Sequence, residues 1–326
     1  MVAMFLSINH TSDDVDPLDA TTEVIRVCKG KLDGQQAQAG LLFTSYMGAD
    51  YHRMLRLIDD AFDGLKLIGC TTDSEISSAM GFSEDSVSLT LFASDEIEFA
   101  TAVATNIKDH SEASFKEAFS HCSAQLSEKP VCGLVFPDGL TSIGIPLDKI
   151  IRTSFGELFP FLGGTAGDHY QLKQTYQFFG TEVYSDAAPV LLFAGPLELF
   201  YRIVSGWTPI GNYAAVEEFE GNKVYRIGGV TAQQFYEHYF GPYQQAFTDF
   251  PLALYREEEG EFVLRTPRSV DEKDGSMIFI GNFFKNSKVR LTTILRDDAI
   301  EAADRANGEL LEEIDGHADV VLSFSC

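Results

Sequence analysis

Apolar and polar positions alternate along this chain with a helical period in some segments and a period of two in others. Two segments carry apolar residues at helical spacing and are predicted to be amphipathic helices. Their apolar positions are Tyr51, Met54, Leu55, Ile58 and Phe62 in the first, and Phe115, Ala118, Phe119, Cys122 and Leu126 in the second. Pro146 suits the first turn of a further helix, which is predicted to run through Phe155.

Between the helices the period changes to two. Val87, Leu89 and Leu91 alternate with hydroxyl-bearing residues, which predicts a half-exposed strand. A turn at 94–96 is predicted to return this strand into one over 97–103. A second turn, at Gly195-Pro196, is predicted to join residues 190–193 to a strand over 199–205. Strands joined so tightly must be antiparallel, so two hairpins are expected.

Two stretches of the chain resemble one another. Gly40–Phe43, a helical segment and Leu65–Thr72 form the first, and Gly133–Phe136, a helical segment and Phe159–Thr165 form the second. Each stretch has the predicted order strand, helix, strand, loop, strand, strand. This self-similarity predicts an internal duplication in the first region, with two halves packed about an approximate two-fold axis. The expected fold class is α/β: layered, mixed and largely antiparallel sheets with helices on one face of each repeat.

The pattern changes after Trp207, and the turn signal Gly221-Asn222 marks a predicted boundary. Thr231 and Gln234 form a predicted capping box for a helix that ends at Gly241-Pro242. Further predicted elements are short strands near 251–255, 262–265, 277–280 and 289–295, a helix near 299–306, and an apolar strand over 320–324. We therefore expect an N-terminal extension over 1–35, a duplicated domain over 36–221 and a second domain over 222–326. Because the last strand has no evident partner, the second domain is expected to be incomplete at its C-terminal end.

Composition excludes several classes of function. The chain has 326 residues and a formal net charge of −25, which repels nucleic acid and anionic membrane surfaces. The opening residues lack the basic segment and apolar length of a signal peptide, and no apolar run is long enough to insert in a membrane, so a cytoplasmic protein is expected. The cysteines lack C-x-x-C spacing, which argues against a disulfide framework or a zinc site. They are Cys28, Cys70, Cys122, Cys132 and Cys326.

The two duplicated loops, 68–75 and 162–168, are the candidate ligand site. Small residues in them let backbone N–H groups approach a ligand, and their hydroxyls and carboxylates suit an amine or amide. The alternative is that the glycines and threonines only permit tight turns where the halves abut. The expected contacts are Cys70, Thr71, Thr72 and Glu75 from one loop and Gly163, Gly164, Thr165 and Asp168 from the other, with Trp207 either walling the pocket or capping a core.

Two chemistries remain open beside non-catalytic binding. Cys70 lies in a loop whose open N–H groups could lower the pKa of its thiol, so a cysteine hydrolase is one alternative, set against simple burial of the thiol. His169 or His238 could ligate haem iron, although the sequence has no cysteine–histidine haem-attachment motif. No other cofactor is indicated, and no metal ligand set is expected apart from these histidines.

Many short pieces, in order along the whole chain, resemble the FIST family of bacterial sensory proteins, with its N and C regions. They include Ala39–Phe43, Ile68–Thr72 with Glu75, Gly81-Phe82, Asp85–Val87, Pro137–Leu140, Gly163-Gly164, Gly167-Asp168, Gly206–Gly211, Gly221–Tyr225, Pro251–Leu254, Asp274–Ser276 and Val320–Cys326. Asp73 departs from the family, which often has a small residue there, and similar proteins continue past a strand such as 320–326.

The resemblance implies a non-catalytic sensory domain that binds a small molecule and signals to a partner such as a histidine kinase, a chemoreceptor or a cyclic-nucleotide enzyme. Some similar proteins are haem-containing nitric oxide sensors, which makes haem-based sensing the second alternative.

Overall fold

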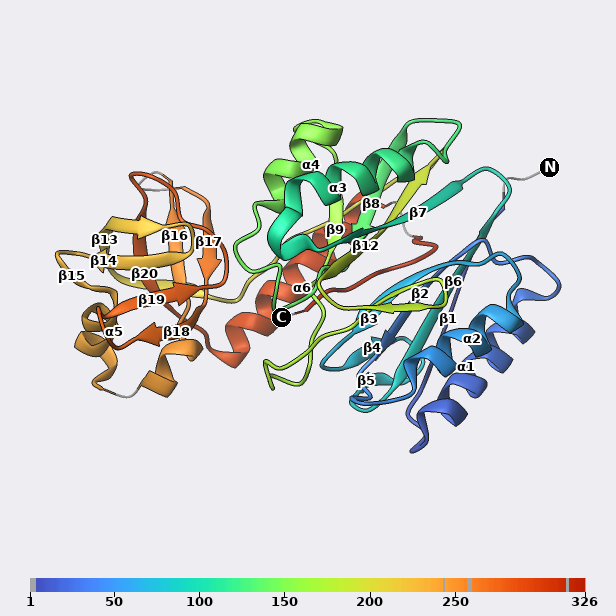
Figure 1. The fold of residues 1–326 in the computed structure, drawn as a ribbon, viewed down its shortest axis with the longest axis horizontal. Helices are drawn as coiled ribbons and strands as arrows, with labels where there is room; N and C mark the ends of the chain where they lie inside the picture. Colours follow the sequence, from blue (N-terminus) through green and yellow to red (C-terminus); the bar gives the residue numbers. More distant parts are fainter. Residues whose placement is uncertain (1–3, 243, 257–259, 315–316, 326) are drawn as a thin grey trace. The chain divides into compact units, whose positions relative to one another are not determined.

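The computed structural model describes residues 4–242, 244–256, 260–314 and 317–325. These residues form two compact units (Figure 1). Unit 1 comprises the chain up to Ser142, Leu147–Leu199 and the segment from Ala318 onward, and unit 2 comprises Ile143–Pro146 and Phe200–His317. The contact-based division thus falls near residue 200, whereas the turn signal had suggested residue 221.

Unit 1 contains two main sheets. In spatial order the first consists of β1 (Phe5–Ser12), β6 (Val87–Ser94), β2 (Ala39–Thr44), β3 (Lys66–Thr71), β10 (Gln177–Phe179) and β11 (Glu182–Tyr184). The second consists of β7 (Glu98–Thr105), β12 (Ala187–Ala194), β8 (Pro130–Val135) and β9 (Phe161–Gly163). Among the described strands of these sheets, β2–β3 and β8–β9 are parallel and the other pairs are antiparallel. A short hairpin of β4 (Glu75–Ser77) and β5 (Gly81–Ser83) stands apart.

Helices cover the outer face of each sheet, and the inner faces pack on one another (Figure 1). The helices α1 (Pro17–Leu32) and α2 (Tyr51–Ala61) cover the first sheet, and α3 (Ile107–Ser123) and α4 (Leu147–Phe155) cover the second. The core between the sheets is rich in aromatic rings, with Phe92 of β6 against Phe99 of β7 and Phe193 of β12. The predicted layered α/β class, with helices on one face of each repeat, is confirmed.

The duplication is visible in the strand order, since β1-β6-β2-β3 in one sheet matches β7-β12-β8-β9 in the other. Matching backbone hydrogen bonds recur in the two copies. They are Thr72 N to Thr44 O (3.0 Å) and Ala166 N to Pro137 O (2.8 Å), and Ser45 N to Ser86 O (3.1 Å) and Asp138 N to Ala187 O (2.8 Å). The matching rings of Phe43 and Phe136 meet edge to face, 5.0 Å between centroids, as expected near a two-fold axis. Residues 5–32, expected to precede the duplication, supply β1 and α1, which correspond to β7 and α3.

The two predicted hairpins are wrong. β6 pairs with β1 and β2, whereas β7 pairs with β12, so residues 95–97 carry the chain from one sheet to the other. The apolar inner faces of both strands favour this crossing, because it buries Phe92 and Phe99 against one another. Residues 199–205 and 320–324, which were predicted to form strands, are irregular in the structure. Ile203 in the first of these segments is 88 % exposed.

Unit 2 is an antiparallel eight-stranded sheet with α5 (Ala232–Phe240) against it. Its strands are β13 (Thr208–Glu220), β14 (Lys223–Ile227), β15 (Val230–Thr231), β16 (Leu252–Tyr255), β17 (Phe262–Arg265), β18 (Pro267–Asp271), β19 (Ser276–Phe279) and β20 (Lys288–Thr293). The remaining helices are the 3₁₀ helix η1 (Gln244–Asp249) and α6 (Arg296–Glu313). The predicted capping box is present, with Gln234 N donating to Thr231 Oγ1 at 3.2 Å. Register shifts within β13 bend the sheet, and Phe235 and Tyr236 of α5 join its core.

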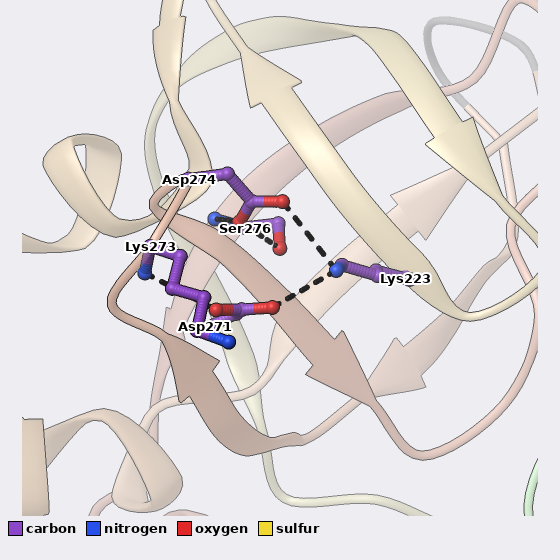
Figure 2. Close-up of polar contacts among 5 residues, drawn as sticks. All are labelled: Lys223, Asp271, Lys273, Asp274 and Ser276. Atoms are coloured by element: carbon purple, nitrogen blue, oxygen red, sulfur yellow. Dashed lines mark hydrogen bonds and ion pairs between the residues drawn. The ribbon is translucent and has the colours of Figure 1, made fainter.

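The β18–β19 turn of unit 2 is fixed by local charge (Figure 2). Lys223 Nζ contacts Asp271 Oδ2 at 3.1 Å and Asp274 Oδ2 at 3.5 Å. The backbone N–H of Lys273 and the Lys223 ammonium lower the pKa of Asp271. The hydroxyl and backbone N–H of Ser276 lower that of Asp274. These acids therefore serve the turn itself.

Among the helices of the described residues, none has both the length and the apolar character needed to cross a membrane.

Candidate functional site

The two nominated loops lie in unit 1 and cross one another. Thr71, at the end of β3, donates its Oγ1 to Gly167 O at 2.8 Å, and Gly167 N donates to Thr71 O at 2.9 Å. Two residues further along each loop, His169 N donates to Asp73 Oδ1 at 2.7 Å. Thr71 N also donates to Tyr176 O at 2.9 Å. The loops are therefore joined by backbone and side-chain hydrogen bonds, with Thr71 fully buried at the crossing.

Two of the loop glycines are required by close backbone approach. A Cβ on Gly69 would overlap the carbonyl oxygen of Leu42, its partner in the β2–β3 ladder. A Cβ on Gly163 would overlap the carbonyl oxygen of Val135 in the same way, and its φ of +143° already favours glycine. At Gly164, by contrast, the nearest atoms to an added Cβ are those of Phe324 at 4.0 Å. Packing thus explains Gly163, whereas Gly164 has room for a larger side chain.

Glu75 is the centre of a buried polar cluster, which we call the Glu75 cluster and define as Ser45, Thr72, Glu75 and Ser86. Glu75 is only 4 % exposed. Its Oε2 accepts from the hydroxyls of Ser45 (2.6 Å) and Ser86, and its Oε1 accepts from Thr72. Burial raises the pKa of Glu75, and the three hydroxyls and His169 act in the opposite direction. The cluster is therefore a desolvated carboxyl held by rotatable donors.

The cluster continues along the inner face of β6 and β1. Ser86, Ser88 and Thr90 occupy alternate positions, and all three are buried. Asn9 Nδ2 donates to Ser88 Oγ at 3.1 Å and to Thr90 Oγ1 at 2.9 Å. The sequence had predicted that this side of the strand faces solvent, which is wrong, since the polar face of β6 is turned inward. Alternating hydroxyl residues were the available signal, but they look the same in a solvent-facing strand.

A second polar cluster occupies the matching place in the other copy. We define the Asp138 cluster as Asp138, Thr141, Thr175 and Gln177. Asp138 Oδ1 accepts from the backbone N–H groups of Leu140 (2.8 Å) and Thr141 (2.9 Å), and Oδ2 accepts from Asp186 N (3.2 Å) and Gln177 Nε2 (3.4 Å). Gln177 is 0 % exposed, and its Oε1, like Thr141 Oγ1, has no hydrogen-bond partner among the described residues. A buried acceptor of this kind is suited to a donor from a water molecule or a ligand.

Asp168 holds its own loop. Its Oδ1 accepts from Leu172 N at 3.0 Å, and its Oδ2 accepts from Lys173 N at 2.7 Å and Gln174 N at 3.1 Å. Burial acts to raise the pKa of this carboxyl, but the backbone N–H groups lower it below its ordinary value. Its carboxylate is thus committed to the loop, whereas Thr165 is exposed.

Cys70 and Trp207 lie in different units. Cys70 is buried in the β3 ladder opposite Gln177, and burial raises the pKa of its thiol, so the structure gives no thiolate nucleophile there. Cys28, Cys122 and Cys132 are also free and buried, with pKa values raised to about 11, 12 and 12. Trp207 belongs to unit 2, directly before β13.

The two nominated histidines lie in different units and have different neighbours. His169 Nε2 lies 2.7 Å from Ser45 O, and because a carbonyl can only accept, that nitrogen carries the proton and donates. His238 lies on the exposed side of α5, against Tyr239. Within the described residues, no group of three or more His, Cys, Asp or Glu side chains could hold a metal ion.

Two grooves of unit 1 are lined by residues other than the nominated ones. The larger, about 580 Å³, lies at the opposite end of β3 from the crossing and includes Gln38, Lys66 and residues 94–99. The smaller, about 170 Å³, lies between β7 and α3. Neither groove includes residues of the loop crossing. The crossing is a polar seam, and it is distinguished by its buried hydrogen-bonding groups.

Unit 1 is a duplicated α/β domain in which two small-residue loops cross beside two buried polar clusters. This crossing is the candidate binding seam. Comparison with family models identifies the family. Residues 38–230 match the FIST N domain and residues 232–326 match the FIST C domain. The chain belongs to the FIST family, whose domains are sensory and associated with signal transduction. None of the curated proteins compared with the chain matches it.

Proposed function

We propose that this chain is a non-catalytic, cytoplasmic sensor that binds a small molecule at the loop crossing of unit 1 and signals to a partner protein such as a histidine kinase. Membership of a sensory family supports the general role. The observation that carries the site is the pairing of the Glu75 and Asp138 clusters on either side of the Thr71–Gly167 crossing. Both clusters are rich in acceptors, so the ligand class they suit best carries an amine or another hydrogen-bond donor.

The proposed roles follow from the geometry. Thr72 and Glu75 supply a hydroxyl and a carboxyl from one loop, and Gly164 and Thr165 supply accessible backbone and a hydroxyl from the other. The Asp138 cluster adds an unused amide oxygen on Gln177. Cys70, Thr71, Gly163 and Asp168 shape the seam, because their side chains or backbones are buried or engaged within the protein.

The test is retention of a ligand through purification. Native mass spectrometry of the purified chain is expected to show a bound small molecule, and Thr72→Val and Gly164→Leu should each reduce the occupied fraction at least about tenfold, the effect of one lost buried hydrogen bond or of steric exclusion. Thr22→Val is the matched control, because Thr22 carries its hydroxyl on the exposed side of α1. Unchanged occupancy in both seam variants would refute the site.

The cysteine hydrolase alternative has its own test. A mild alkylating probe at neutral pH is expected to leave Cys70 unlabelled in the native protein and to label it after unfolding in urea, because burial keeps the thiol protonated and covered. Rapid native labelling of Cys70 would revive a nucleophilic role.

A further inference from the structure

Segment 318–325 lies within unit 1 as an extended chain that joins no described sheet. Its side chains alternate. Val320 and Leu322 are partly buried against the core between the sheets, whereas Val321 between them is 80 % exposed. The segment therefore has the burial pattern of a strand without the hydrogen-bonded ladder of one.

The two ends of the segment contact different sheets. Near its start, Ser7 Oγ of β1 donates to Asp319 O at 2.6 Å, and β1 is an edge strand of the first sheet. Near its end, the ring of Phe324 lies 5.8 Å from that of Phe136, directly after β8 in the second sheet. Phe324 is also the nearest neighbour of Gly164 in the candidate site. The segment thus bridges the two sheets along one side of the sandwich.

Elsewhere in the unit a different element joins the two copies. There β10, from the second copy, is hydrogen-bonded to β3 of the first through the pairs Gln177–Cys70, Phe178–Gly69 and Phe179–Ile68. Phe178 is fully buried, whereas Phe324 is 38 % exposed. Because the segment buries less and forms no ladder, its local opening costs less than the opening of β10.

We propose that segment 318–325 is a detachable strap that closes the seam of unit 1 beside Gly164. Its contacts with the unit are made by Val320, Leu322 and Phe324. The bearing of the strap on ligand retention rests on the proposed function, because Gly164 is one of the proposed contacts.

Hydrogen exchange followed by mass spectrometry tests the strap directly. Leu322→Ser removes a side chain packed on the core between the sheets, and Phe324→Ser removes the ring beside Phe136. Each is expected to speed exchange about tenfold or more in peptides covering 318–325 and 161–166. The matched control is Val321→Ser, which changes an outward side chain of the same segment. Peptides covering α2 (Tyr51–Ala61) report global stability and are expected to exchange at the wild-type rate in all three variants.

Two results would overturn the proposal. In one, Leu322→Ser and Phe324→Ser behave like Val321→Ser. In the other, the α2 peptides speed up as much as the strap does, which would make the segment an integral part of the core. Ligand occupancy of the same variants separates this proposal from the proposed function. Faster local exchange with unchanged ligand occupancy supports the strap and removes its link to the ligand. Whether the ligand binds at the seam at all is tested only by the Thr72→Val and Gly164→Leu variants.

Discussion

In the first copy of unit 1 the residue that follows β2 is Ser45, whereas the matching residue after β8 in the second copy is Asp138. Ser45 donates to a carboxylate brought by a later loop, and Asp138 is itself the carboxylate and gathers backbone N–H groups. The glycines of β3 and β9, by contrast, serve the same purpose in both copies. The backbone geometry has been retained in both copies while the polar chemistry at the crossing has diverged.

The largest expected effect tests the shared glycines. Gly69→Ala should destabilise unit 1 by about 4 kcal/mol, because its Cβ would overlap Leu42 O in a strand paired on both sides. Gly163→Ala should cost about 2 kcal/mol, since β9 is an edge strand that can shift. Gly164→Ala, with open space at its Cα, is the control and should cost less than about 1 kcal/mol. Urea unfolding measures all three, and equal costs at Gly69 and Gly164 would contradict the ladder argument.

The next test separates the two carboxyl clusters. Asp138→Ala should cost about 3 kcal/mol, because it leaves backbone N–H donors that cannot turn elsewhere. Glu75→Ala should cost about 2 kcal/mol, since the hydroxyls of Ser45, Thr72 and Ser86 can rotate to other acceptors. The controls are Asp138→Asn and Glu75→Gln, which keep an acceptor. A reversed order would show that the hydroxyls have no alternative partner.

A pH titration of stability contrasts Glu75 with Asp168. Burial raises the folded-state pKa of Glu75, so the folded protein binds this proton more tightly than the unfolded chain does. The contribution of Glu75 to the free energy of unfolding is therefore complete below the pKa of the unfolded chain, near 4.5. It is lost as the pH rises through the higher pKa of the folded state. Asp168 has a lowered pKa, so its contribution is complete above about 3.8 and is lost on acidification.

Urea midpoints measured from pH 3 to 8 give the two contributions as differences between wild type and variant. The difference between wild type and Glu75→Gln should fall with rising pH above 4.5, and that between wild type and Asp168→Asn should fall with decreasing pH below about 4. If both differences changed in the same direction with pH, the assigned environments would be contradicted.

The smallest expected effect concerns the first helix of each copy. Asp16 caps α1 by accepting from Leu18 N and Asp19 N, so Asp16→Ala should cost about 1 kcal/mol. Asn106, at the start of α3, has a φ of 54° and makes no side-chain cap bond, so Asn106→Gly should lie within about 0.5 kcal/mol of wild type. Thermal unfolding distinguishes these values, and a large loss at Asn106 would indicate a cap that forms in solution.

Local patterns predicted the elements better than their pairing. The spacing of Met54, Leu55 and Ile58 was sufficient for α2, and the matching glycine loops were sufficient for the duplication. The turn at 94–96 was also recognised, but turn chemistry does not determine which sheet the next strand joins. That choice depends on burying Phe92 against Phe99, an interaction between sheets that residue spacing does not encode.

The candidate site was predictable only in part, for a related reason. Glycine-rich loops after apolar strands identified the crossing, yet Ser45, Ser86, Asp138 and Gln177 were missed. Each lies on a strand or within three residues of the end of one, where a polar residue usually faces water. Only the packing of one sheet on the other shows that these side chains point into the interior.

The passage of the chain from β6 to β7 at residues 95–97 has a practical consequence. A cut there would divide unit 1 into fragments that each carry one copy of the repeat, and each fragment alone would expose an aromatic sheet face to water. The fragments would have to associate to bury these faces, with β10 of the second adding to the sheet of the first. Divided at this point, the molecule could report the proximity of two fused proteins through reassembly.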